Sequence, residues 1–185
     1  MKRFFKNYLG FTLVELMVVI FIITLVSTIA GTNLSKGRKI YNLMQATQRL
    51  MADIRVAQNY SLNVKYISSS PKNYYAISIE DPVGNSYSIN AFNENGAKTT
   101  IKEVSLPLNI FFNIDIATPL NIGFEVPFAS PGEFNEDADG YMDTGSFTPL
   151  SDESHIQIPL VIKNNASITN SVIIYSNGLV EIDKN

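Results

Sequence analysis

The residues from Phe11 to Gly31 form an apolar segment of the length that crosses a lipid bilayer. These 21 residues, FTLVELMVVIFIITLVSTIAG, contain one ionisable side chain, Glu15. As a helix with a rise of 1.5 Å per residue, they extend about 31 Å, which matches the hydrocarbon core of a membrane. A cleaved secretory signal has a shorter apolar core with a small-x-small cleavage site after it, whereas here the helical pattern continues. We therefore predict a transmembrane helix over residues 11–31.

Glu15 is the anomaly in this segment. An ionised carboxylate in hydrocarbon costs roughly 2.5–3.5 kcal/mol on insertion scales, so it indicates a function. The alternative is that Glu15, within a turn of the helix start, reaches the membrane interface with help from the helix dipole. The flanking charges do not fix the orientation, because three basic residues precede the segment and three follow it. They are Lys2, Arg3, Lys6, Lys36, Arg38 and Lys39.

The stretches KRFFKNYLG and FTLVELMVVI together resemble the class III signal of bacterial type IV prepilins and pseudopilins. The shared features are the charged leader, Gly10, the aromatic Phe11 and Glu15. The resemblance implies that prepilin peptidase cleaves after Gly10 and methylates the nitrogen of Phe11. The mature chain would then have 185 − 10 = 175 residues and, without three basic leader residues, a net charge of −3 − 3 = −6. It also implies that Glu15 pairs with the N-terminal amine of a neighbouring subunit.

The resemblance further implies a structural subunit rather than an enzyme. The precursor would be a single-pass protein of the bacterial inner membrane with a cytoplasmic N-terminus, and later part of a periplasmic or extracellular filament. Its expected partners are prepilin peptidase, other pilin or pseudopilin subunits, an inner-membrane assembly platform, and membrane lipid before assembly. The kind of filament, and whether DNA or a secreted substrate is the final ligand, stay open. The alternative is an uncleaved, membrane-tethered exported binding module, which should tolerate changes at Gly10 and Glu15.

Residues 32–63 continue the helix as an amphipathic segment, so we predict one helix from about Thr12 to about Leu62. Its apolar side chains recur at helical spacing and predict a face that packs on the following domain. This stripe consists of Ile40, Leu43, Met44, Thr47, Leu50, Met51, Ile54 and Ala57. The opposite, solvent-facing side is expected to carry Arg38, Asn42, Gln45, Arg49, Asp53 and Gln58. For Arg49, Arg55 and Lys65 a solvated face or filament contacts are favoured over a DNA site.

Residues 64–185 are predicted as a β-rich globular domain. About eight segments from Tyr74 onwards alternate or run apolar between turn residues, as strands do. Asn177-Gly178 between two of them predicts a hairpin with a type I′ turn. The expected fold class is therefore α+β, with the long helix packed on an antiparallel sheet or small β-sandwich. The segments LMADIRVAQNYSL and SVIIYSNGLVEI resemble minor pseudopilins of the GspH/FimT class, and the absence of cysteine excludes a disulfide.

The domain is acidic, since residues 66–185 hold fifteen Asp or Glu against five Lys or Arg. One stretch, GEFNEDADGYMDTGSF, has oxygen-bearing residues at the alternate spacing of a calcium loop. The candidate ligands are Asn135, Asp137, Asp139, Tyr141 through its carbonyl, and Asp143. The twelfth position is Ser146 instead of a bidentate Glu, a role that Asp152 or Glu153 could take. A solvated acidic loop, or one neutralised by the basic stem of a partner, is the alternative to this calcium site.

Overall fold

The computed structural model describes residues 11–63, 74–93, 95–115, 119–126, 129–134, 147–152, 154–163 and 165–184. The chain divides into two compact units, Met1–Arg38 (unit 1) and Lys39–Asn185 (unit 2). Helix α1, Leu13–Leu62, has residues in both units. All the strands belong to unit 2.

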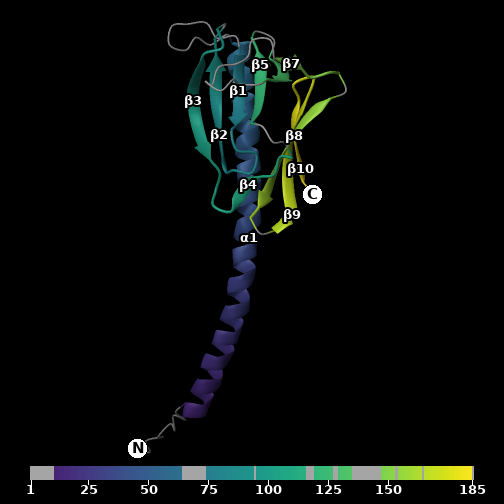
Figure 1. The fold of residues 1–185 in the computed structure, drawn as a ribbon. Helices are drawn as coiled ribbons and strands as arrows, with labels where there is room; N and C mark the ends of the chain where they lie inside the picture. Colours follow the sequence, from purple (N-terminus) through teal and green to yellow (C-terminus); the bar gives the residue numbers. More distant parts are fainter. Residues whose placement is uncertain are drawn as a thin grey trace, which may run out of the picture. The chain divides into compact units, whose positions relative to one another are not determined.

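Ten strands build unit 2, and every hydrogen-bonded pair among them is antiparallel. Sheet 1 has six strands in the order β3-β2-β1-β5-β6-β7, and sheet 2 has four in the order β10-β9-β8-β4 (Figure 1). The strands are β1 Tyr74–Ile79, β2 Ser86–Phe92, β3 Lys98–Ser105, β4 Ile110–Phe112, β5 Leu120–Glu125, β6 Ser130–Glu133, β7 Thr148–Pro149, β8 His155–Ile162, β9 Asn165–Tyr175 and β10 Val180–Lys184. The predicted α+β class is confirmed.

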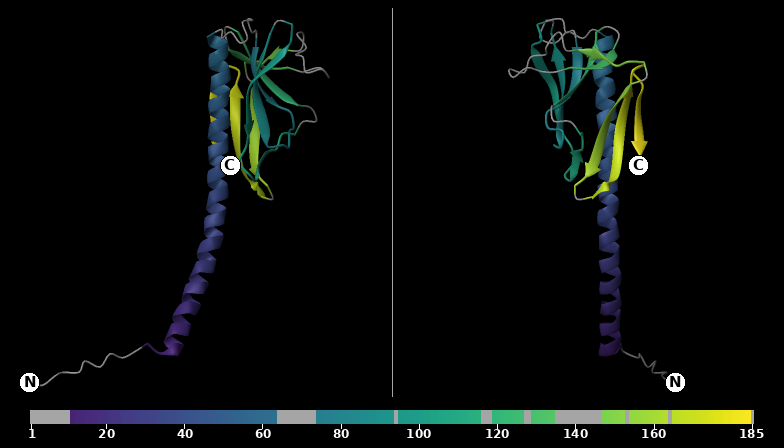
Figure 2. Two further views of the ribbon diagram at one scale, coloured as in Figure 1. Left: turned by 90° about the vertical axis from the view of Figure 1, so that its left-hand side faces the viewer. Right: turned by 45° about the vertical axis from the view of Figure 1, so that its right-hand side comes forward.

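The unit 2 part of α1 closes the core of this domain. Leu43, Leu50, Ile54 and Ala57 are at most 1 % exposed and join one buried cluster with side chains from both sheets. Figure 2 shows the strands gathered on one side of this part of the helix. The predicted apolar stripe is therefore the packing face, although Ile40 at its beginning remains 44 % exposed.

The prediction that Asp53 faces solvent is wrong, because the structure buries this residue to 6 % exposure. Its carboxylate accepts a hydrogen bond from the Tyr87 hydroxyl of β2 at 2.7 Å. It also accepts one from Nζ of Lys102 on β3 at 2.6 Å. Burial, followed by the hydrogen bond to Asp53, raises the pKa of Tyr87 well above its ordinary value. These partners explain how a carboxylate can lie at the border between the helix and sheet 1.

The predicted hairpin between β9 and β10 is present, but its predicted type I′ turn is wrong. Positive φ among the described residues of this loop is confined to Gly178, at 81°. The Gly178 N–H donates to the Tyr175 carbonyl at 2.9 Å, and the Tyr175 N–H donates to the Leu179 carbonyl at 2.9 Å. This is the three-residue pattern of a type I turn followed by a left-handed glycine. Asn177 supports it with its side-chain oxygen, which accepts the Leu179 N–H at 2.9 Å.

Candidate functional site

Helix α1 begins at a side-chain cap. Oγ1 of Thr12 accepts the backbone N–H of Glu15 at 3.2 Å, and the Thr12 carbonyl accepts the N–H of Leu16 at 3.2 Å. These bonds make Thr12 the N-cap and put Glu15 at the third helical position, the spacing of a capping box. A carboxylate in this first turn is favoured by the positive end of the helix dipole. The Thr-x-x-Glu spacing was the sequence signal for this cap, and the sequence analysis did not use it.

The described side chains of the segment after this cap form an apolar surface within unit 1. Every large apolar side chain from Leu13 to Ile29 is at least 41 % exposed, and Phe11 is 75 % exposed. The hydroxyls of Thr24 and Thr28 donate to backbone carbonyls one turn earlier, at 2.8 and 2.9 Å, so they are satisfied within the helix. Exposed apolar surface of this extent marks a place where lipid or another protein binds. We call this surface, from Phe11 to Ile29, the apolar stem.

Glu15 is the charged residue of the apolar stem. Its side chain is exposed, and it forms no ion pair with any residue that the structure describes. Phe11 lies four residues before it, at the beginning of the same stem, whereas Gly10 lies outside the described residues. The carboxylate is thus available to a cation from another molecule once water is excluded from the surface.

The five predicted calcium ligands, Asn135, Asp137, Asp139, Tyr141 and Asp143, all lie outside the described residues. The calcium site therefore stays a prediction. In the part of the chain that the structure does describe, no group of three or more His, Asp or Glu side chains could hold a metal ion.

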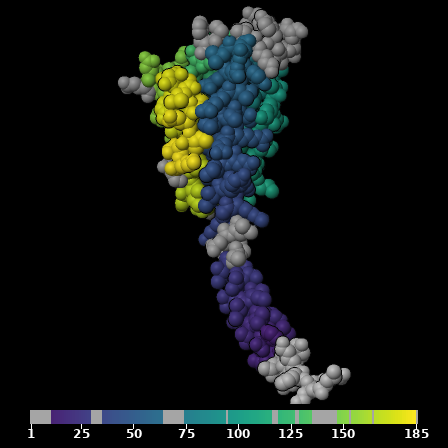
Figure 3. All heavy atoms as spheres, turned by 180° about the vertical axis from the view of Figure 1, so that it is seen from behind, coloured from purple at the N-terminus to yellow at the C-terminus, as the bar shows by residue number. Residues whose placement is uncertain are grey.

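The basic residues on the outer face of α1 have different surroundings. Arg49 is exposed, whereas Nη2 of Arg55 donates to the Val180 carbonyl of β10 at 3.2 Å. Nε2 of Gln58 likewise donates to the Gly178 carbonyl at 2.9 Å. Figure 3 shows this part of α1 (blue) uncovered between the C-terminal strands (yellow) and strands of sheet 1 (teal). Arg55 therefore holds the helix against sheet 2 rather than standing free in solvent, and Lys65 lies outside the described residues.

Among the described residues, no helical stretch combines the length and the apolar character needed to cross a membrane.

Comparison with known proteins gives one match. Residues 5–31 match the family model of the prokaryotic N-terminal methylation motif. No curated protein and no solved structure matches the chain. The match supports a type IV pilin-like class III signal on residues that include Gly10, Phe11 and Glu15. The more specific GspH/FimT-like assignment remains a prediction.

Proposed function

We propose that this chain is the precursor of a structural subunit, a minor pilin or pseudopilin, of a type IV pilus-like or type II secretion-like filament. The observation that carries the proposal is the match of residues 5–31 to the N-terminal methylation motif. The exposed apolar stem that follows it supports the same conclusion. Prepilin peptidase would cleave between Gly10 and Phe11 and methylate the new N-terminus. The role is one of assembly, not of catalysis.

The apolar stem needs a covering at each stage of this pathway. In the precursor, inserted in the bacterial inner membrane with a cytoplasmic N-terminus, lipid covers it. After extraction by an assembly platform, the stems of neighbouring subunits cover it in a periplasmic or extracellular filament. Burying an unpaired carboxylate costs several kcal/mol, while a paired one is tolerated. Pairing of Glu15 with the ammonium of Phe11 in a neighbouring subunit would therefore select one register of assembly.

Two variants of the full chain test this proposal in cells that contain prepilin peptidase and the assembly machinery. Gly10→Ala should keep the leader attached, because the cleavage signal is lost. Glu15→Leu should be processed but should be missing from the sheared filament fraction, because the register-selecting charge is absent. Glu181→Leu, which alters an exposed carboxylate of β10, is the matched control and should assemble normally. Normal processing and incorporation of both test variants would contradict assembly and favour the uncleaved tethered module.

A further inference from the structure

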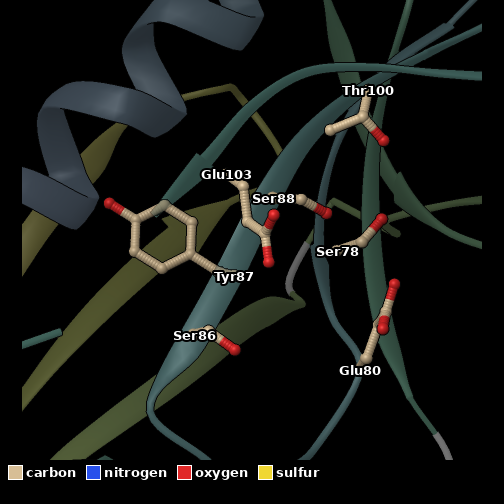
Figure 4. A pocket seen from close by; sticks show the side chains of 7 residues that line it. All are labelled: Ser78, Glu80, Ser86, Tyr87, Ser88, Thr100 and Glu103. Atoms are coloured by element: carbon tan, nitrogen blue, oxygen red, sulfur yellow. The ribbon is translucent and has the colours of Figure 1, made fainter. Parts of the chain in front are cut away.

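Sheet 1 carries a polar hollow on the face that points away from α1. Ser88 of β2 is paired directly with Ser78 of β1 and with Glu103 of β3, so these three side chains share one face of the sheet. Tyr87 points the other way, towards α1 and Asp53 (Figure 4). The hollow has a volume of about 150 Å³. Its remaining side chains belong to Glu80, Ser86 and Thr100.

The floor of the hollow presents hydroxyl donors. Ser78 is 1 % exposed and Ser88 is 9 % exposed, and behind them lies the fully buried Asn90. Nδ2 of Asn90 donates to Oγ of both serines at 2.8 Å. Because the amide is the donor in both bonds, each serine keeps its own hydroxyl hydrogen for another acceptor. At the exposed rim, Glu80 and Glu103 supply carboxylate acceptors.

The polar character of this face is not explained by the stability of the fold. Oδ1 of Asn90 and Oδ1 of Asn121, a direct neighbour of Ser78 on β5, are buried without a hydrogen-bond partner. Leaving such a group unpaired costs roughly 1–3 kcal/mol, which an apolar side chain at the same position would avoid. Buried polar groups without partners call for an explanation such as an ordered water, an ion or a ligand.

The chemistry of the hollow selects among ligands. Its lining side chains offer hydroxyl and carboxylate oxygens, and Lys98 lies beside it, 3.4 Å from Glu80. With two carboxylates at the rim, an anion is disfavoured. The volume has room for roughly ten water molecules, which is far more than one bare ion needs. A neutral ring with several hydroxyl groups fits better, because each hydroxyl can donate to a carboxylate and accept from a serine.

From these observations we propose that the hollow between Ser78, Ser88 and Glu103 binds a neutral monosaccharide unit, free or at the end of a glycan. Ser88 and Ser78 donate to sugar hydroxyl oxygens, and Glu103 accepts a sugar hydroxyl hydrogen. The site is small and open, so the expected affinity for one sugar is weak, with a Kd of about 1 mM. This inference does not depend on the proposed role in a filament.

The test uses the full chain in a zwitterionic detergent without a sugar headgroup. Glucose, galactose, mannose and N-acetylglucosamine are titrated one at a time and followed by saturation-transfer difference NMR. At least one sugar should bind, and Glu103→Gln and Ser88→Ala should each weaken it by roughly tenfold or more, because each removes a hydrogen bond to the ligand. Glu181→Gln in sheet 2 is the matched control and should bind as the unmodified chain does.

Two further measurements keep the test decisive. Thermal melting shows whether each variant still folds, and deoxy analogues of the bound sugar probe the same hydrogen bonds without any mutation. A deoxy sugar that lacks the contacting hydroxyl should lose at least about tenfold in affinity, since the site groups are then left unpaired. Absence of binding by every sugar at roughly ten times the expected Kd would overturn the proposal. Unchanged binding by Glu103→Gln would also overturn it, as would binding of calcium alone that Glu103→Gln abolishes.

Discussion

Asp53 is the buried charge that joins α1 to sheet 1, and its removal should unfold the domain more easily. Tyr87, which is 2 % exposed, donates its hydroxyl to this carboxylate at 2.7 Å. Lys102 donates from the other side at 2.6 Å, but its side chain is 42 % exposed. In Asp53→Ala the tyrosine hydroxyl therefore stays buried without an acceptor, whereas the lysine can return to water.

The magnitude follows from this difference between the two partners. An unpaired buried hydroxyl together with a lost charge-assisted hydrogen bond predicts a cost of about 3 kcal/mol for Asp53→Ala. Tyr87→Phe, which removes one hydrogen bond to a charged group, should cost about 2 kcal/mol. The double variant leaves neither an orphaned hydroxyl nor a buried charge, so it should cost about 3 kcal/mol instead of 5, a coupling of about 2 kcal/mol. Lys102→Met, the half-exposed control, should cost less than about 1 kcal/mol.

Urea unfolding of the full chain in detergent, followed by tyrosine fluorescence, measures these free energies. Thermal melting should agree, with Asp53→Ala lowering Tm by about 6–12 °C for a unit of this size. If the costs of Asp53→Ala and Tyr87→Phe add to within about 0.5 kcal/mol, the two side chains are not coupled and the reasoning is refuted. A cost for Lys102→Met that equals the cost of Asp53→Ala would place the energy in the ion pair instead.

Three more predictions concern pH, backbone strain and calcium. The folded-state pKa of Tyr87 is raised above its ordinary 10.0, so its contribution to stability is present below pH 10 and is lost as the pH rises further. Unfolding at about pH 9 and about pH 11 should show this loss, up to about 1.4 kcal/mol per pH unit, and Tyr87→Phe should reduce it. Gly178→Ala should cost about 1 kcal/mol because φ is +81° there, while Gly37→Ala in the helix should not destabilise; equal melting shifts would contradict this. Calorimetry should detect calcium with a Kd of about 0.1–1 mM, lost in Asp137→Asn/Asp139→Asn, and an absence of heat with the unmodified chain would refute the predicted site.

The elements that follow one clear periodicity could be predicted from the sequence. The spacing of Leu43, Leu50 and Ile54 marked the packing face of α1, and the alternation in YYAISI and SYSINAF matched β1 and β2 residue for residue. Two short strands, β6 and β7, were missed because SPGE and TP read as turn residues, and their pairing depends on β5. Such strands are set by tertiary pairing, which local pattern does not encode.

The candidate site divided in the same way. The contiguous motif from Gly10 to Glu15 could be recognised in sequence, because its residues are neighbours along the chain. The Asp53–Tyr87–Lys102 contact could not, since its members are separated by 34 and 49 residues from Asp53 and a lone Asp on a helix usually faces water. The polar hollow was equally invisible, because only the strand register places Ser78, Ser88 and Glu103 side by side.

The intact mass and N-terminal sequence of the protein from its native membranes test the proposed processing most directly. Prepilin processing predicts a chain of 185 − 10 = 175 residues that begins at Phe11 and carries one additional methyl group on its N-terminal nitrogen. A chain that still begins at Met1, in cells whose prepilin peptidase is active, would contradict assembly into a filament and leave a membrane-tethered binding module as the better explanation.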